Sequence, residues 1–195
     1  TINTTATVAD APIVAAGATV TGTEGLSTGS VLVATFADAD PGAVVGDFTA
    51  TIAWGDGTSS AGTITAIGAP NGVTFRVNGT HTYAEEGVYA VTTTIVDAGG
   101  SQTVAHGQAV IADAPLTTAT GVPVSATEGT ALVNVPVLTF VDTNPVGTIS
   151  DFTATIDWGD GTISLGTITQ PGGVGTPFTV TGNHTYVEEG SYPIK

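Results

Sequence analysis

The chain has 195 residues, of which 10% are charged, and its 17 acidic and two basic residues give a net charge of −15 at pH 7. Nucleic acids and anionic membrane surfaces are bound through clustered Lys and Arg, so this balance argues against both as partners. The lack of cysteine excludes a disulfide framework and a thiolate metal site, and no apolar run is long enough for a transmembrane helix.

The chain opens on a segment that recurs later. Residues 1–10 resemble residues 105–113, and both segments run into Ala-Pro, which disfavours helix and suggests a short, stiff joint. We therefore predict that residues 1–10 are the closing strand of a preceding repeat or a donor strand. A first repeat then spans residues 11–113 and a second repeat spans residues 114–195.

The first repeat alternates between short apolar strands and turns. In residues 47–54, alternate positions carry Phe48, Ala50, Ile52 and Trp54, which should share one buried face. The following Gly-Asp-Gly supplies residues that tolerate the backbone of a tight hairpin. Turn signals every eight to twelve residues or so predict an all-β fold, an antiparallel sandwich. The expected strands are residues 31–36, 47–54, 63–67, 72–83, 88–97 and 101–112.

The second repeat matches the first almost residue for residue and then stops. Lys195 aligns with Thr92 and Thr1 aligns with Val104, so two full periods lack counterparts of residues 93–103. We expect the second sandwich to lack most of its last two strands, which leaves two explanations open. Either the chain was cut from a longer array, or an identical chain supplies the missing edge. In the second case the donor side chains are Ile2, Ala6 and Val8, and the open-ended contact makes filaments.

The motifs of both repeats resemble a known family. Trp-Gly-Asp-Gly-Thr, followed by His-Thr-Tyr-x-Glu-Glu-Gly-x-Tyr and an alternating strand ending in Asp, resembles the PKD family of Ig-like β-sandwich modules. The Phe-x-Asp-x-Asp-Pro loop and the Glu-Glu-Gly turn are similar to tandem repeats of very large bacterial surface proteins and adhesins. One aromatic position is shifted by two residues from the family pattern Trp-x-Phe-Gly-Asp-Gly, which alters packing but not the turn. The motif residues are Trp54, Asp56, His81, Tyr83, Tyr89, Trp158, Asp160, His184, Tyr186 and Tyr192.

The resemblance implies two tandem Ig-like β-sandwiches in an extracellular or cell-surface protein, acting as spacer, adhesion or accessory modules without catalysis. The residues themselves support the absence of catalysis. His81 and His184 lack the further nitrogen or sulfur ligands that zinc needs, so we interpret them as local hydrogen-bonding partners. Adjacent glutamates at 85–86 and 188–189 lie on a turn, whereas glycosidases need two carboxyls that face each other.

Calcium is the one cofactor that the sequence suggests. Side chains with oxygen ligands at alternate positions of an acidic loop suit a hard cation with six to eight ligands. The alternative is that these side chains cap the turn by bonding its backbone. The candidate ligands are Asp38, Asp40 and Asp47 in the first repeat and Asp142, Asn144 and Asp151 in the second.

These observations favour a structural repeat of an extracellular bacterial stalk, adhesin or self-assembling fibre, whose partners are neighbouring repeats or identical chains. The alternative is a carbohydrate- or protein-binding accessory module of a secreted enzyme. Binding faces usually expose aromatic side chains. Here all twelve aromatic residues occupy positions shared by both repeats, which favours roles in the core.

Overall fold

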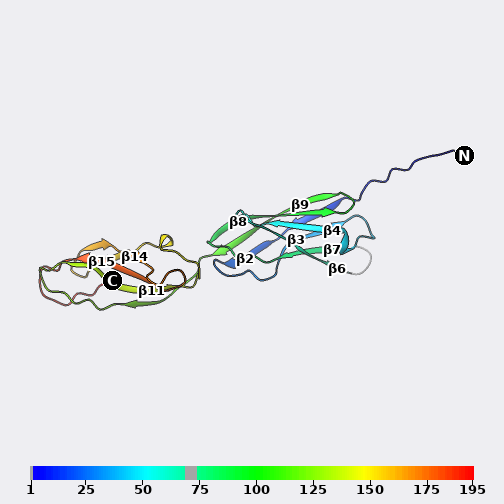
Figure 1. Cartoon of the computed structure of the whole chain (residues 1–195). Helices are drawn as coiled ribbons and strands as arrows, with labels where there is room; N and C mark the ends of the chain where they lie inside the picture. Colours follow the sequence, from blue (N-terminus) through cyan, green and yellow to red (C-terminus); the bar gives the residue numbers. More distant parts are fainter. Residues whose placement is uncertain (1, 69–73) are drawn as a thin grey trace. The chain divides into compact units, whose positions relative to one another are not determined.

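The computed structural model describes residues 2–68 and 74–195, and the chain separates into two compact units, Thr1–Asp113 and Ala114–Lys195. We call them unit 1 and unit 2. Both are built from strands (Figure 1), and the helical segments of the described residues are two 3-10 turns, Val45–Asp47 and Ile149–Asp151. In this described part, no helix has the length and apolar character needed to cross a membrane.

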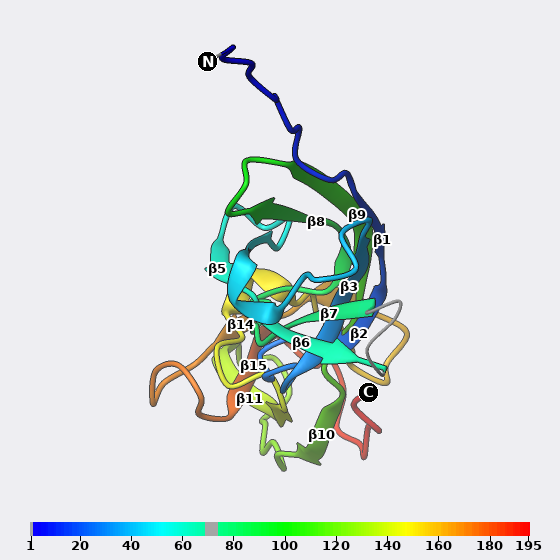
Figure 2. The same cartoon turned by 90° about the vertical axis from the view of Figure 1, so that its right-hand side faces the viewer.

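Unit 1 is a sandwich of two sheets (Figures 1 and 2). The four-stranded sheet has the order β1-β3-β7-β6 and the five-stranded sheet has the order β2-β9-β8-β4-β5. This arrangement confirms the predicted all-β sandwich. The strands are β1 (Ile13–Gly17), β2 (Thr19–Thr23), β3 (Val31–Asp38), β4 (Phe48–Ala53), β5 (Ser59–Ala61), β6 (Thr63–Ile67), β7 (Thr74–Gly79), β8 (Gly87–Asp97) and β9 (Gln102–Ala112).

One pair of strands departs from the antiparallel prediction. Strand β2 pairs with β9 in parallel, with Val20 opposite Ala109. The reason lies at Ala18, where the chain passes from β1 in one sheet directly to β2 in the other. The crossing is tight, because a Cβ on Gly17 would lie 2.2 Å from the carbonyl carbon of His106. The parallel pair therefore depends on a contact between residues almost 90 positions apart.

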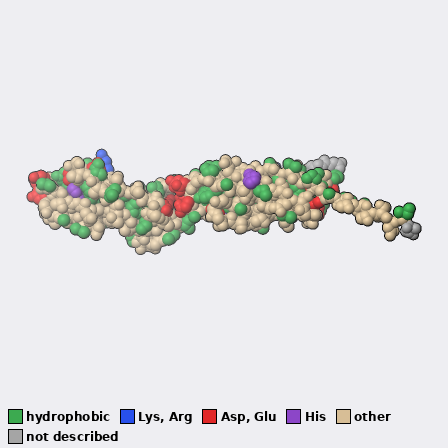
Figure 3. Space-filling view, turned by 90° about the horizontal axis from the view of Figure 1, so that it is seen from above, with side chains coloured by type: hydrophobic (Ala, Val, Ile, Leu, Met, Phe, Trp, Pro, Cys, Tyr) green, Lys and Arg blue, Asp and Glu red, His purple; other side chains and the backbone are tan. Residues whose placement is uncertain are grey.

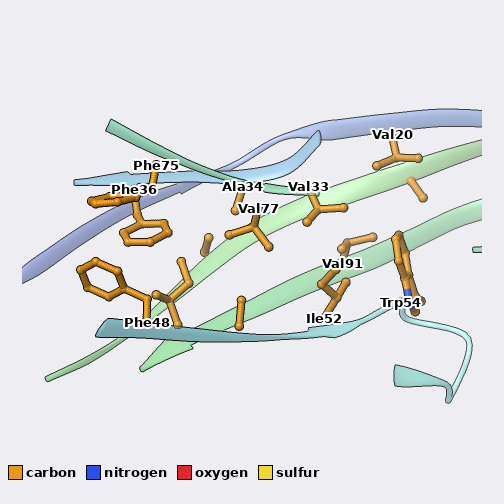
Figure 4. Close-up of a cluster of buried hydrophobic side chains, with 14 of the residues drawn as sticks. Val20, Val33, Ala34, Phe36, Phe48, Ile52, Trp54, Phe75, Val77 and Val91 are labelled. Atoms are coloured by element: carbon orange, nitrogen blue, oxygen red, sulfur yellow. The ribbon is translucent and has the colours of Figure 1, made fainter. Parts of the chain in front are cut away.

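The core of unit 1 lies between the two sheets. In β4, Phe48, Ala50 and Ile52 are buried while the intervening threonines are exposed, as the alternation predicted. The predicted alternation of β8 is also confirmed, with Val91, Thr93 and Ile95 buried. Figure 4 shows Phe36, Phe48 and Phe75 together at one end of this core and Trp54 at the other.

The strands also differ from their predicted bounds in places. The strand expected at residues 72–83 is β7, Thr74–Gly79, and residues 72 and 73 lie outside the described residues. Past Gly79 the chain turns towards the hairpin after β4, and a Cβ on Gly79 would lie 2.5 Å from Ile52 Cδ1. Strand β5, which no pattern of the sequence indicated, pairs with β4 beyond this hairpin.

Unit 2 contains the first part of the same sandwich. Its four-stranded sheet has the order β10-β11-β15-β14, and its second sheet contains only β12 and β13. In unit 2, of which every residue is described, the segments that align with β2 and with the first half of β8, residues 122–127 and 190–195, are not assigned to strands. Its strands are β10 (Leu116–Gly121), β11 (Leu132–Asp142), β12 (Thr155–Asp157), β13 (Ile163–Leu165), β14 (Thr167–Thr169) and β15 (Phe178–His184).

The surface carries few charged side chains. In Figure 3 the acidic side chains form a few small groups, and most of the visible surface is neither charged nor hydrophobic. The ion pairs found among the described residues join a histidine to an aspartate in each unit, His81 to Asp56 and His184 to Asp160. These two pairs belong to the motif that the repeats share.

Candidate functional site

The residues of the shared motif meet at the hairpin that follows β4. We call Trp54, Asp56, His81 and Tyr83 the Trp-Asp-His-Tyr cluster of unit 1. The Trp54 side chain is fully buried, and its Nε1 donates a hydrogen bond to Ser60 Oγ at 2.9 Å. The His81 ring stacks on the Trp54 ring with centroids 4.8 Å apart and an angle of 10° between the planes.

Hydrogen bonds tie this cluster together. His81 Nε2 lies 2.6 Å from Asp56 Oδ2, and the Tyr83 hydroxyl donates to the Trp54 carbonyl at 3.0 Å. The Tyr89 ring stacks on Tyr83 at 4.5 Å, and its own hydroxyl donates to the Glu85 carbonyl at 2.8 Å. The polar atoms of the motif therefore bond to one another and to nearby backbone.

The glycines on both sides of Asp56 let the hairpin close in this way. Gly55 has a φ of 88° and Gly57 a φ of 91°, and residues other than glycine rarely adopt such backbone angles. A Cβ on Gly55 would also lie 2.5 Å from the Ala90 carbonyl oxygen. Between them, Asp56 Oδ1 accepts hydrogen bonds from the backbone N–H and the hydroxyl of Thr58. The turn thus aims the other carboxylate oxygen at His81.

The electrostatics of the cluster follow from this geometry. Partial burial favours the neutral form of Asp56, but hydrogen bonds from Thr58 and His81, with the attraction to His81, outweigh it and lower the pKa of Asp56 to about 2. Burial, with the nearby charges of Asp56 and Tyr89, raises the pKa of Tyr83 to about 12. Asp56 is therefore ionised and Tyr83 neutral throughout the physiological pH range.

Unit 2 repeats the cluster with Trp158, Asp160, His184 and Tyr186. His184 stacks on Trp158 at 4.7 Å and lies 2.8 Å from Asp160, while the Tyr186 hydroxyl donates to the Trp158 carbonyl at 3.0 Å. Tyr192 stacks on Tyr186 at 4.6 Å. The cluster ties the hairpin to the segment that carries His184 and Tyr186. The tyrosine hydroxyls, which are the candidate nucleophiles of the two clusters, donate hydrogen bonds to backbone carbonyls.

The acidic loops place their carboxylates against their own backbone. In unit 1, Asp38 accepts from the N–H of Asp40 at 2.7 Å, Asp40 from that of Gly42 at 2.8 Å and Asp47 from that of Val44 at 2.8 Å. In unit 2, Asp142, Asn144 and Asp151 make the matching bonds to the N–H groups of Asn144, Val146 and Thr148. These are the turn-capping bonds of the alternative interpretation, and calcium at these loops stays a prediction.

A different acidic group is gathered more tightly. Glu24, Glu85 and Glu86 each offer a carboxylate oxygen within 4.8 Å of the others, and Glu128, Glu188 and Glu189 do the same in unit 2. Glu24 is only 4% exposed and accepts a hydrogen bond from the Glu86 N–H at 2.9 Å. These glutamates are the described residues best placed to hold a cation, and oxygen ligands of this kind suit calcium.

Spacing along the sequence does not bring these glutamates together, because the turn at residues 85–86 follows Glu24 by about 60 positions. The available signal was the recurrence of a lone glutamate and of Glu-Glu-Gly at matching positions of both repeats. Their meeting depends on the chain folding back across the sandwich, where the Gly25 N–H donates to the Tyr83 carbonyl at 2.8 Å.

The proposed donor residues lie at the start of unit 1, outside its sheets. Residues 2–10 belong to no strand, and Ile2 and Val8 are 96% and 89% exposed. The segment extends away from the sandwich of unit 1 (Figure 2). Its end is fixed at Asp10, whose Oδ2 accepts from the Ser101 N–H at 2.7 Å.

No protein-family model and no curated protein matches the chain. Among solved structures, the chain is similar to the PKD domain of an M14-like peptidase from Thermoplasmatales archaeon SCGC AB-540-F20, with 21% identity and a TM-score of 0.36. That match covers 54% of this chain and 99% of the other. A second match is to the zebrafish RET cadherin-like domains 1 to 4, with 11% identity and a TM-score of 0.35, over 88% of this chain and 43% of that one.

Proposed function

We propose that the chain is a non-catalytic structural segment of an extracellular bacterial stalk, adhesin or self-assembling fibre, joined to identical chains by strand complementation. The observation that carries this proposal is that the residues repeated between the two units bond to one another within each sandwich. In both units the Trp-Asp-His-Tyr cluster braces the sandwich itself, through the bonds from Tyr83 to Trp54 and from Tyr186 to Trp158. The residues that recur in both repeats therefore serve to hold the fold together.

The aromatic side chains support the same proposal over a binding module. Sugar- and protein-binding faces rely on exposed aromatic rings. The twelve aromatic side chains of this chain are all buried or partly buried, and Tyr89 and Tyr192, the outermost of the motif, stack on Tyr83 and Tyr186. The extracellular bacterial setting rests on the resemblance of the motifs to repeats of large surface proteins.

Stretching single chains tests the structural role. A stalk segment has to resist tension, so we expect unit 1 to unfold in one force-resisting step in an optical-tweezers or force-microscopy experiment. Its strands run from Ile13 to Ala112, so the step should add about 350 Å, at roughly 3.5 Å for each of some 100 residues. Gradual extension without a resisted step would contradict the proposal.

A pull-down with insoluble polysaccharides tests the alternative. We expect the chain to stay in the supernatant with cellulose, chitin or a bacterial exopolysaccharide. Retention that is competed by the soluble oligosaccharide would replace the structural proposal with the accessory-module function. A replacement of Tyr89 by Phe keeps the stacked ring and is the control for damage to the fold.

A further inference from the structure

We infer that unit 2 of one copy binds residues 2–10 of a second copy as an added strand, in the slot that β9 fills in unit 1. The inference rests on the proposed function and names the partner, the segment and the register. Three features of the described residues support it: the surroundings of β9, the matching groove of unit 2, and the exposed segment at the start of the chain.

In unit 1, β9 lies between two strands of the same sheet. It pairs with β2 in parallel and with β8 antiparallel, so that Ala109 stands between Val20 and Tyr89, and Ile111 between Gly22 and Gly87. Ala109 is fully buried and Ile111 is 4% exposed. Strand β9 therefore closes the core along this edge.

Unit 2 has both walls of this slot. Residues 122–127 align with β2 and its flanks, and residues 190–195 align with the first half of β8. The second wall is fixed in place, because the Lys195 N–H donates to the Asp157 carbonyl at 2.9 Å and the Asp157 N–H donates to the Lys195 carbonyl at 2.8 Å. These bonds correspond to the pairing of Ala53 with Thr92 in unit 1.

The space between these walls is a groove. Its volume is about 510 Å³, and its lining includes the apolar side chains of Val124, Ala126, Tyr192 and Ile194 together with the three glutamates Glu128, Glu188 and Glu189. Val124 is partly buried, whereas the aligned Val20 is 1% exposed. A further strand in this groove would cover Val124 and the other apolar side chains of its lining.

The start of the chain has the sequence that this groove needs. Residues 2–12, INTTATVADAP, align with residues 105–115, AHGQAVIADAP. Ile2, Ala6 and Val8 then take the places of Ala105, Ala109 and Ile111, whose side chains are buried in unit 1. In that register Ala6 lies between Val124 and Tyr192, and Val8 between Ala126 and Gly190. Both segments end in Ala-Asp-Ala-Pro, so the added strand leads into the next unit as β9 leads into unit 2.

One position fits less well. Thr4 takes the place of Gly107, where a Cβ would lie 2.3 Å from the Ala18 carbonyl oxygen. Thr4 therefore forces the added strand away from residue 122, and we expect Thr4→Gly to strengthen the association several-fold. Because the donor lies in unit 1 and the acceptor in unit 2, each bound copy leaves one free end, and the assembly grows as an open chain.

The test measures the mass of the full chain by light scattering after gel filtration at increasing concentration. We expect masses that rise in multiples of 19.1 kDa. Val8→Asp should abolish this growth, because it places a charge at a buried position of the added strand. Its matched control is Thr7→Asp, because Thr7 aligns with Val110, which is 40% exposed and points outwards. Neither residue belongs to a sheet of the free chain, so both variants should fold.

A synthetic peptide of residues 2–12 gives an independent readout. It should shorten the assemblies and bind the Val8→Asp chain with one site, as followed by fluorescence polarisation. A chain that stays at 19.1 kDa at all concentrations, or that associates equally well with Val8→Asp, would overturn the inference. That result would remove strand complementation from the proposed function, and it would leave the structural role standing if unit 1 still unfolds in one resisted step. If association is preserved but unit 1 unfolds without a resisted step, strand addition between copies stands and the proposed structural role fails.

Discussion

At the scale of single residues, the pairing of Asp56 with His81 shows how a turn and a strand end cooperate. The sequence predicted that the histidines form local hydrogen bonds, but it did not name their partner. The partner lies 25 residues away, at the tip of a hairpin whose glycines aim its carboxylate. Spacing along the chain cannot reveal such a contact, because it forms only when the sandwich closes.

The lowered pKa of Asp56 predicts how unit 1 responds to acid. Its folded pKa of about 2 lies below the ordinary value of 3.8, so its ionisation stabilises the fold above about pH 4. That stabilisation is lost as the pH falls from 4 towards 2. Asp56→Asn should therefore lower the free energy of unfolding by about 1–2 kcal/mol near neutral pH and have little effect near pH 2. Urea unfolding followed by tryptophan fluorescence in a Trp158→Phe background, in which Trp54 reports on unit 1 alone, measures both values.

The control for this experiment is Asp113→Asn, which changes an exposed aspartate outside the cluster. It should leave the pH dependence as it is in the parent chain. Equal destabilisation by Asp56→Asn at pH 7 and pH 2 would show that the carboxylate charge does not contribute.

The calcium hypothesis also belongs to the scale of residues. If the acidic loops bind calcium, millimolar Ca²⁺ should raise the melting temperature and EDTA should reverse the change. A ligand at 100 times its Kd adds about 2.7 kcal/mol. Asp40→Asn should remove the effect in unit 1, because it lowers the charge and keeps the oxygen that accepts from the Gly42 N–H.

Glu86→Gln is the matched variant for the glutamate group. If the rise in melting temperature with Ca²⁺ survives Asp40→Asn but disappears in Glu86→Gln, the calcium site is at the glutamates and not at the acidic loop. A melting temperature that responds to neither Ca²⁺ nor EDTA would contradict calcium binding at both places.

At the scale of elements, the strands with strict alternation were predictable and the others were not. Residues 48–53 and 87–97 alternate because one face of each strand is buried along its length. Strand β5 has three residues, Ser59–Ala61, and its place depends on pairing with β4. Strand β2 lies parallel to β9 because the chain changes sheets at Ala18. Neither feature has a local pattern, since tertiary contacts decide both.

The packing of β7 on β4 leads to a prediction about Gly79. An added Cβ would lie 2.5 Å from Ile52 Cδ1 and 2.8 Å from Trp54 Cζ2, two side chains buried in the core. Gly79→Ala should therefore destabilise unit 1 by about 1–3 kcal/mol through overpacking. Urea unfolding in a Trp158→Phe background measures this, because Trp54 then reports on unit 1 alone.

Gly46→Ala provides the comparison, because a Cβ on Gly46 meets no other group within 4 Å. Its free energy of unfolding should stay within about 0.5 kcal/mol of the parent. If both variants lose the same stability, the cost comes from the change of residue type and not from the crowding at Ile52 and Trp54.

At the scale of the whole molecule, the two units share a motif but differ in the size of their cores. Among the described residues, the core cluster of unit 1 holds 18 buried residues, from Ile13 to Ile111, and that of unit 2 holds seven, from Val137 to Tyr186. Buried apolar area supplies most of the stability of a domain. The sequence predicted this difference by aligning Lys195 with Thr92, whereas the groove between residues 122–127 and 190–195 became visible only with both walls in place.

We therefore expect two transitions in calorimetry, with unit 2 melting below unit 1. Gly79→Ala should lower only the upper transition. Gly182→Ala should reduce the temperature of the unit 2 transition alone, since its Cβ would lie 2.5 Å from Ile156 Cδ1 in unit 2.

The Val8→Asp chain provides unassociated molecules, to which the peptide of residues 2–12 is then added. Because it binds the folded unit 2 and not unit 1, the peptide should raise the lower transition alone, by about 2.7 kcal/mol of stability at 100 times its Kd. A single transition would contradict the difference in core size. A peptide that stabilised unit 1 instead would contradict the groove as its binding site, because β9 already occupies that slot there.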